Sequence, residues 1–438
     1  MKILIKNTTI ITLNKSRMLL KDSNIVIEDQ LISYIGDKVL PDSDYDRVID
    51  GSNRVIMPGY INAHTHFYSS FAKGIGGIAS SESFMEVLEN MWWKLDKGLR
   101  LEDTYYSALT AIMDGIKNGV TTFIDHHASP YAVTNSLPEI AKAVERMGVK
   151  ACLCYETSDR DGVDIKDAGI LENFSFIENN KNPNIIGLIG LHASFTLSDK
   201  TLEEIVAKNT NNYGYHIHVS EDKADELDAN KKYKTSVVER LHKYGIVNKR
   251  SILAHCVNIS EKDRQIIKDN DGMIVHNPES NLNNAVGISD VLSQVNDGIL
   301  VGIGTDAMTN KMGNEMRIAL WLQHLKHKNP SCGFMEIASL LLENNAKIAN
   351  RLWNTDKFGV IKEGNYADII MLDYDPITPL NEDNVVGHIV FGIAEANVVT
   401  TISNGKILWH NNQFEDFIDQ HQINKHSREL AKKVWERI

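Results

Sequence analysis

The chain has 438 residues, a formal net charge of −12 and a pI near 5.7. Hydrophobic residues make up 42% and charged residues 24%, an ordinary balance for a globular protein with a large core. The acidic balance argues against a nucleic-acid-binding surface, which would be basic. No apolar run approaches the roughly 18 residues of a membrane span. We therefore expect no nucleic-acid partner and no membrane partner.

The beginning of the chain and its cysteines both favour a cytoplasmic protein. The first residues, MKILIKNTTIITLNK, alternate apolar and polar side chains, carry Lys6 within the apolar part and lack a small-residue cleavage site. They predict a strand and not a signal peptide. The four cysteines do not form the paired CxxC pattern of a zinc ribbon. Cys152 and Cys154 alternate within a predicted strand, so we expect packed, reduced thiols.

Both ends of the chain have the texture of short β-strands. Residues 1–57 contain β-type runs separated by turn signals, and similar runs return at residues 358–411. Each half alone has few strands, so we expect the two halves to fold together as one β-sandwich domain. Residues 412–438 are highly charged and predict a C-terminal helical tail.

The middle of the chain, residues 58–357, has the pattern of a parallel (β/α)8 barrel. Short apolar runs alternate there with longer amphipathic stretches. Helices are predicted at 101–119 and 136–148, for example, and each stops at a glycine. The predicted fold is thus α/β, a TIM-like barrel with a small β-sandwich built from both chain ends. Eight strands are predicted, at residues 60–66, 121–127, 150–156, 185–194, 214–220, 251–257, 272–278 and 299–306.

Ligand-type side chains recur where the predicted barrel strands end. His64 and His66 close the first strand, His218 lies on the fifth and Asp306 ends the eighth. Active sites of this fold lie at the carboxyl ends of the strands. His64 and His66 share a face because a strand repeats every two residues. A buried carboxylate such as Asp306 is costly unless it is paired, protonated or bound to a metal. These four residues are our predicted ligands of one divalent metal ion.

The ligand types indicate which ion and which chemistry to expect. Three imidazoles and one carboxylate suit Zn²⁺ best, with Fe²⁺ or Mn²⁺ as alternatives. Such an ion lowers the pKa of a bound water to ~7, so that a nucleophile exists at neutral pH. His216 shares a face with His218 and is predicted to lie below it as a hydrogen-bonded support. No role is predicted for the remaining histidines of the strand ends, His126, His127 and His276.

Further polar and aromatic residues could complete an active site. Glu221 follows the fifth strand where the chain turns into a loop, so its carboxylate could move a proton between water and a leaving nitrogen. His255 closes the sixth strand and could polarise a substrate carbonyl or a water molecule. His192 is a candidate substrate contact at the end of the fourth strand. Trp92 and Trp93 could form a wall for a flat ring, or be ordinary core residues.

The motifs, taken together, carry a family resemblance. The segments MPGYINAHTH, HIHVSE, LAHC, HNPESN and GIGTD, in this order and spacing, resemble the amidohydrolase superfamily. The similarity is to the branch of chlorohydrolases and deaminases of cytosine, guanine and adenosine-type substrates, and it covers nearly the whole chain, including the divided β-sandwich. The segments WWKLD, FIDHHASP, CYETSDR and GHIVFG are also similar to an aminohydrolase group associated with selenium metabolism in anaerobic bacteria.

This resemblance implies roles for several of the residues already singled out. Glu221 takes the position of a proton shuttle and His255 the position beside the reacting carbon. Asp306, besides binding the metal, would orient and deprotonate the water. Asn277 and Ser280 would brace the site. The resemblance also implies a single metal, because no lysine ends the fourth strand, where dinuclear members carry a carboxylated lysine.

One difference from the family bears on the substrate. Adenosine-type deaminases of this branch hold the ribose hydroxyls with a glutamate, and that position looks like Leu95 here, next to Asp96. This difference favours a compact heterocycle over a nucleoside. Contacts to such a substrate are expected from His192 and Trp92.

The favoured function is metal-dependent hydrolysis of a non-peptide C–N bond, with release of ammonia from a heterocycle such as a purine or pyrimidine. Two alternatives keep the enzyme class: opening of a cyclic amide, or displacement of chloride. A third is a non-catalytic metal-binding accessory protein in the maturation of selenium or molybdenum enzymes. A scaffold has no need of a proton shuttle, so Glu221 and His255 argue against it. A homodimer is expected.

Overall fold

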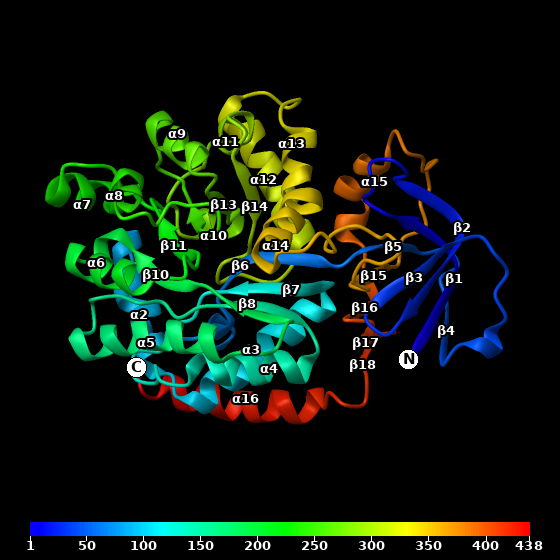
Figure 1. The fold of residues 1–438 in the computed structure, drawn as a ribbon, viewed down its shortest axis with the longest axis horizontal. Coiled ribbons are helices and arrows are strands. Elements are labelled where there is room, and N and C mark those ends of the chain that lie inside the picture. The colour runs from blue at the N-terminus through cyan, green and yellow to red at the C-terminus, as the bar shows by residue number, and fades with distance from the viewer.

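The computed structural model describes all residues, 1–438, and shows a barrel beside a smaller strand-rich region (Figure 1). The barrel strands are parallel, and they pair in the order β6-β7-β8-β9 and β10-β11-β12-β13-β14. Parallel bridges between Thr65 and Asp306 and between Thr157 and Leu191 join the two groups. The strands are β6 (Tyr60–Thr65), β7 (Val120–Asp125), β8 (Lys150–Leu153), β9 (Ile185–Gly187), β10 (Ile189–Ala193), β11 (Tyr215–Val219), β12 (Ile252–His255), β13 (Met273–His276) and β14 (Leu300–Ile303).

The eight predicted barrel strands are all present, and the fourth is divided. Its first part, β9, pairs with β8, and its second part, β10, pairs with β11, with Leu188 between them. Every residue of β6, β7, β11 and β12 is buried, as expected for parallel strands covered on both faces. The barrel prediction is therefore confirmed.

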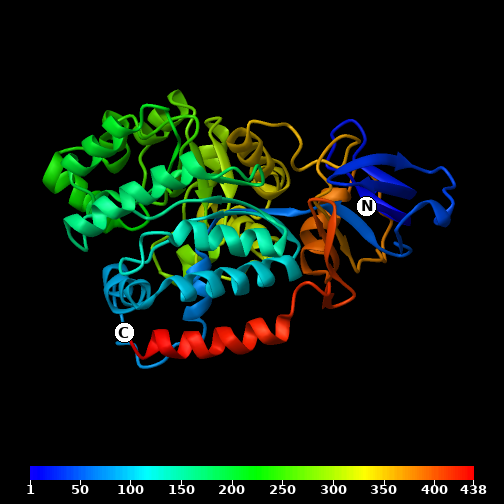
Figure 2. The same ribbon diagram turned by 60° about the horizontal axis from the view of Figure 1, so that its bottom comes forward.

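Helices surround the barrel and connect its strands (Figures 1 and 2). Gly119 and Gly148 follow α3 and α4 with φ of 82° and 75°, the left-handed conformation that glycine tolerates at a helix end. The π-helical turn η5 (Leu340–Asn344) separates α13 from α14. The helices are α3 (Leu101–Lys117), α4 (Ser136–Met147), α5 (Val163–Asn179), α6 (Asp199–Lys208), α7 (Lys223–Tyr233), α8 (Val237–Lys243), α9 (Glu261–Asp269), α10 (Pro278–Asn283), α11 (Val291–Asn296), α12 (Met312–His327), α13 (Phe334–Ser339) and α14 (Asn345–Trp353).

The two chain ends fold together. Strand β5 pairs with β1 from the N-terminal part and with β15 from the C-terminal part, and one nine-stranded sheet results. Its apolar core combines residues of both ends, for example Ile3 and Ile25 with Ile369 and Ile402. Helix α15 (Val385–Phe391) lies in the same region. The strands are β1 (Lys2–Ile11), β2 (Leu19–Glu28), β3 (Leu31–Gly36), β4 (Arg47–Asp50), β5 (Val55–Pro58), β15 (Ile369–Leu372), β16 (Val398–Ser403), β17 (Lys406–His410) and β18 (Gln413–Phe414).

The C-terminal tail contains the predicted helix, α16 (Gln420–Trp435), which runs along the barrel and is drawn in red in Figure 2. Leu430 and Val434 pack against Leu95 and Leu99 of the segment before α3. The Trp435 indole N–H donates to the carbonyl of Phe71 at 2.7 Å. The tail thus supports a segment that lines the cavity described below. No helix of the structure combines the length and the apolar character that crossing a membrane requires.

Candidate active site

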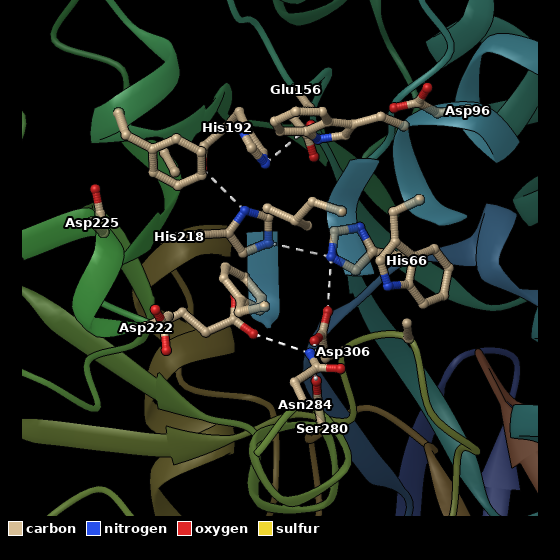
Figure 3. Close-up of a pocket in the computed structure, with 18 of the residues that line it drawn as sticks. His66, Asp96, Glu156, His192, His218, Asp222, Asp225, Ser280, Asn284 and Asp306 are labelled. Atoms are coloured by element: carbon tan, nitrogen blue, oxygen red, sulfur yellow. Dashed lines mark hydrogen bonds and ion pairs between the residues drawn. The ribbon is translucent and has the colours of Figure 1, made fainter. Parts of the chain in front are cut away.

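The four predicted metal ligands meet at the carboxyl ends of the barrel strands (Figure 3). Their ligand-type atoms all lie within 4.8 Å of one another. His66 Nε2 is 2.8 Å from Asp306 Oδ1 and 3.3 Å from His218 Nε2, and His64 Nε2 is 3.5 Å from Asp306 Oδ1. Strands β6, β11 and β14 bring these side chains together from positions up to 242 residues apart in the sequence.

Two of these histidines are oriented by backbone carbonyl groups. His66 and His218 donate from Nδ1 to carbonyl oxygens, those of His126 at 2.5 Å and His192 at 3.0 Å. A proton on Nδ1 leaves the Nε2 lone pair of each ring free to bind a cation located beside Asp306 Oδ1. Fixing the ring through the second nitrogen is the usual support of a metal-binding histidine.

His64 is oriented from below by another histidine. Its Nδ1 lies 2.8 Å from His216 Nε2, so His216 has the supporting position predicted for it. Burial lowers the pKa of His64 to about 3 and that of His216 well below its usual value, so both rings are neutral. His64 Nε2 is buried and has no hydrogen-bond partner. A buried lone pair without a partner is costly in a protein interior, and a cation would satisfy it.

The donor set fits a divalent ion. In a tetrahedral site with Zn–N distances of ~2.0–2.1 Å, neighbouring ligand atoms are ~3.3–3.4 Å apart. The three distances here, 2.8, 3.3 and 3.5 Å, lie close to that separation. The nitrogen and oxygen ligands match the preferences of zinc, iron and manganese equally, so the geometry supports a divalent metal without selecting one.

Asp306 is held in place by its backbone and by its second carboxylate oxygen. Its φ of 54° lies in the left-handed region, which is uncommon outside glycine and is found in functional loops. The Ser280 hydroxyl donates to Asp306 Oδ2. Burial would raise the pKa of Asp306, but contacts with His64 and His66 bring the pKa well below its usual range. The carboxylate is therefore ionised.

Glu221 and His255 form a pair beside the ligand cluster. His255 Nε2 lies 3.5 Å from Glu221 Oε2 and 3.9 Å from Asp306 Oδ2, and it has no hydrogen-bond partner. Burial, together with the Asp306 charge, raises the pKa of Glu221 to about 7, against an opposing effect of His255. A carboxyl group with a pKa near neutrality can both take up and release a proton. Such perturbed carboxyls are concentrated at functional sites.

Helix α10 and the residue that follows it supply hydrogen-bond partners to the site, and two of them, Asn281 and Asn284, were not predicted from the sequence. Three side chains each contact a different residue of the ligand cluster or the adjacent pair. These contacts are Ser280 Oγ to Asp306 Oδ2, His255 Nδ1 to Asn281 Oδ1 at 2.8 Å, and Asn284 Nδ2 to Glu221 Oε1 at 3.2 Å. The bracing predicted for Ser280 is therefore present in the geometry, whereas the buried Asn277 side chain has no hydrogen-bond partner.

The beginning of α10 is anchored from α12. The Glu279 backbone N–H donates to Glu315 Oε2 at 3.1 Å, and Glu315 is fully buried. Burial raises the pKa of Glu315 well above its usual value and so favours the protonated form of this carboxyl. A neutral acid can accept the backbone hydrogen bond without placing a charge in the interior.

A cavity that is open to solvent lies beside the ligand cluster. His192, Trp92 and Trp93 line it, so the predicted substrate contacts all face this space. Trp92 ends the π-helical turn η3 (Leu88–Trp92), and Trp93 begins α2 (Trp93–Gly98), both preceded by α1 (Phe84–Val87). Such π-helical turns are frequent at functional sites. His126, His127 and His276 are buried and do not line the cavity.

The structure changes the interpretation of Leu95. Its side chain is fully buried in an apolar cluster with Tyr68, Phe71 and the C-terminal helix, and it does not line the cavity. The next residue, Asp96, does line the cavity. Leu95 therefore offers no polar group to a substrate, whereas Asp96 faces the cavity. A carboxylate is present at this place in the wall.

Further charged residues line the wall that adjoins the ligand cluster, among them Asp96 and Glu156 (Figure 3). Glu156 Oε2 is 3.3 Å from His126 Nδ1, and its Oε1 is 3.7 Å from His192 Nε2. Arg160 pairs with Asp96 and lies above the Trp93 ring, 5.3 Å from its centroid. The sequence analysis quoted the two segments that form this cluster, WWKLD and CYETSDR, for their family resemblance, and it assigned no chemistry to Glu156 or Arg160.

Comparisons with known proteins agree with this geometry. The model of the amidohydrolase family matches residues 55–408. A 5-methylthioadenosine/S-adenosylhomocysteine deaminase of Thermococcus sibiricus is 34% identical over 421 residues, covering 93% of this chain and 94% of the relative.

Solved structures show the same fold at low sequence identity. A zinc-containing adenosine deaminase from Xanthomonas campestris has a TM-score of 0.84 at 19% identity and covers 99% of this chain and 98% of its own. The zinc complex of the atrazine chlorohydrolase of Arthrobacter aurescens has a TM-score of 0.81 at 19% identity, with 98% and 100% covered. This chain therefore belongs to the amidohydrolase family and is a hydrolase of carbon–nitrogen bonds other than peptide bonds.

Proposed function

We propose that the chain removes an amino group from a heterocycle by hydrolysis, at a single zinc ion held by His64, His66, His218 and Asp306. The observation that carries this proposal is the position of Glu221 and His255. Glu221 lines the cavity, and His255 is buried beside it with Nε2 3.5 Å from Glu221 Oε2 and 3.9 Å from Asp306 Oδ2, so an acid–base pair lies next to the ligand cluster. Bound zinc would supply a Lewis acid and a water activated near neutral pH.

The side chains divide the proton transfers among them. Asp306 is ionised and accepts a proton from the attacking water, which it also orients. Glu221, whose pKa is raised to about 7, carries a proton to the departing nitrogen. His255 stabilises the charge that develops at the reacting carbon, and Asn281 fixes its ring through Nδ1. His192 and Trp92 contact the substrate ring in the cavity.

The names of relatives support an adenine-type ring. The Thermococcus sibiricus relative is a deaminase of 5-methylthioadenosine and S-adenosylhomocysteine, and its similarity extends over nearly the whole of both chains. Ring opening or displacement of chloride would need the same residues. Product mass distinguishes these reactions, since deamination exchanges an amino group for oxygen, ring opening adds a water molecule, and dechlorination releases chloride without ammonia.

The test is an assay of ammonia release by protein loaded with Zn²⁺, Mn²⁺ or Fe²⁺, with purines, purine nucleosides, pyrimidines and triazines as substrates. Glu221→Gln should lower kcat by at least ~10²-fold, the lower range for general acid–base catalysis, with unchanged metal content. Glu203→Gln is the control, because Glu203 is exposed on α6 and away from the cavity. Full activity of Glu221→Gln would refute the role of Glu221, and lack of turnover on the whole panel would refute the function.

A further inference from the structure

The cavity has an unusual charge balance. Arg160 is the only lysine or arginine that lines it. The acidic residues that line it are Asp96, Glu156, Glu221, Asp222, Asp225 and Asp306. A divalent ion would offset the negative charge of Asp306. In the adjoining wall, the positive charge of Arg160 is balanced by its acidic partners Asp96 and Glu156. The chemistry of that wall determines which substituents a substrate can carry there.

Arg160 is already occupied by acidic partners. Its Nη2 pairs with Asp96 Oδ2 and lies 3.7 Å from Glu156 Oε1, while its Nε is 3.0 Å from Asp161 Oδ2. The side chain is only 9% exposed. Burial opposes its charge, but these carboxylates raise the pKa of Arg160. The guanidinium is thus charged, largely buried and surrounded by carboxylates.

The carboxylates of the wall outnumber the cation that they share. Burial would raise the pKa of Glu156, but His192, His126 and Arg160 bring it well below its usual range, so Glu156 is ionised. Asp161 has a second partner in Lys97, at 2.8 Å. Asp96 and Glu156 therefore share the single charge of Arg160. A substrate anion at this wall would be placed among like charges, without a free cation to receive it.

Two polar atoms at the wall have no partner. Asp96 Oδ1 and Trp93 Nε1 are buried and make no hydrogen bond, and both residues line the cavity. The first is an acceptor and the second is a neutral donor. Buried polar atoms are normally paired, so both are suited to a group that enters with the substrate.

We infer that this wall selects substrates with a neutral or cationic, hydrogen-bond-donating substituent, and rejects those with a carboxylate or phosphate in its place. The inference rests on the proposed function for the orientation of the substrate, with its amino group at the ligand cluster and its substituent at Asp96 and Trp93. This inference narrows the substrate class. The name of the Thermococcus sibiricus relative gives two substrates: 5-methylthioadenosine has no carboxylate, and S-adenosylhomocysteine has one in its amino-acid end. The inference favours compounds of the first kind for this chain.

The experiment compares pairs of compounds that share a ring and differ in charge. One pair is adenosine and adenosine 5′-phosphate, and another is the 5-carboxamide and the 5-carboxylate of cytosine. Burial raises the pKa of Asp96 to about 7, so the assays are run at pH 8, where this carboxylate is ionised. We expect kcat/KM of the neutral compound to exceed that of the anion by at least ~100-fold, as close like charges in a partly buried site would produce.

Two variants test whether the wall causes this preference. Asp96→Asn removes one negative charge at constant shape. It should lower the ratio of kcat/KM for the neutral compound to kcat/KM for the anionic compound by at least ~10-fold. Should this variant fail to fold, Glu156→Gln tests the same charge balance. Asp199→Asn is the matched control, because Asp199 pairs with the buried Arg240 at 2.9 Å and lies outside the cavity. An unchanged ratio in correctly folded Asp96→Asn and Glu156→Gln would overturn the inference.

A binding measurement separates this inference from the proposed function. Trp92 and Trp93 line the cavity, so quenching of tryptophan fluorescence reports binding even without turnover. Preferential binding of the neutral compounds with no ammonia release would refute the proposed function and support the selectivity of the wall. Deamination of neutral and anionic compounds with kcat/KM within ~3-fold would leave the function intact and overturn the inference.

Discussion

Replacing Asn281 by leucine should separate the support of His255 from the binding of substrate. The Asn281 Oδ1 accepts from His255 Nδ1 at 2.8 Å, and both residues are buried. Asn281 does not line the cavity, and its Nδ2 has no hydrogen-bond partner. Leucine has a similar volume, so the substitution removes only one side-chain hydrogen bond, the one from His255 Nδ1.

The size of the effect follows from that single hydrogen bond. A buried donor left without its acceptor costs about 1–3 kcal/mol. The His255 ring can avoid this cost by turning, or by moving its proton to Nε2, which faces Glu221 at 3.5 Å. Either change removes the arrangement that catalysis needs, so kcat should fall roughly 5- to 150-fold. KM should stay within about twofold of the wild-type value because no residue of the cavity wall is altered.

The assay is steady-state ammonia release by zinc-loaded protein, with metal content and Tm measured on the same preparations. Asn270→Leu is the control, because Asn270 makes its side-chain hydrogen bond to Ile266 within α9, away from the site. A wild-type kcat for Asn281→Leu would refute the claim that Asn281 positions His255 for the reaction. A loss of kcat together with lost metal or a much lower Tm would instead indicate a structural role.

Two further perturbations test the ligand set and the anchor of α10. Removing the metal with a chelator should abolish ammonia release and lower Tm, because an ion at 1,000 times its Kd stabilises the folded state by about 4 kcal/mol. Equal Tm and equal activity with and without the metal would contradict the ligand set. Glu315→Gln should retain activity, because a neutral amide can accept from the Glu279 N–H as the protonated acid does. Burial raises the pKa of Glu315 above 4.5, so wild-type stability should decline as pH rises from that value through the folded-state pKa, and the variant should lack this slope in urea unfolding at several pH values.

Several features of the site could be predicted from local sequence. The HxH at residues 64–66 lies on one face because strand side chains alternate, and parallel strands end on the same side of a barrel. The positions of His218 and Asp306 followed from the same argument, and the structure brings them together with His64 and His66. The alternation of short apolar runs with amphipathic stretches predicted the barrel. This prediction required only the hydrophobic periodicity of each segment.

Other features depend on contacts between distant parts of the chain. Arg160 and Asp96 are 64 residues apart in the sequence, and Asn284 and Glu221 are 63 apart. No periodicity relates such residues, so their pairing could not be predicted from the sequence. The burial of Leu95 could not be predicted for the same reason: it packs against Leu430 and Val434 of a helix from the other end of the chain.

The division between these two kinds of feature has a physical cause. Which face of a strand a side chain takes, and at which end the strand stops, are set by backbone geometry over a few residues. Which charges neutralise one another, which histidine nitrogen stays free and which carboxyl becomes neutral depend on packing and dielectric environment, and these arise only when the whole barrel is closed. The amino-acid sequence therefore indicated where a metal-dependent hydrolase site would lie, and the folded structure determined how its wall is charged.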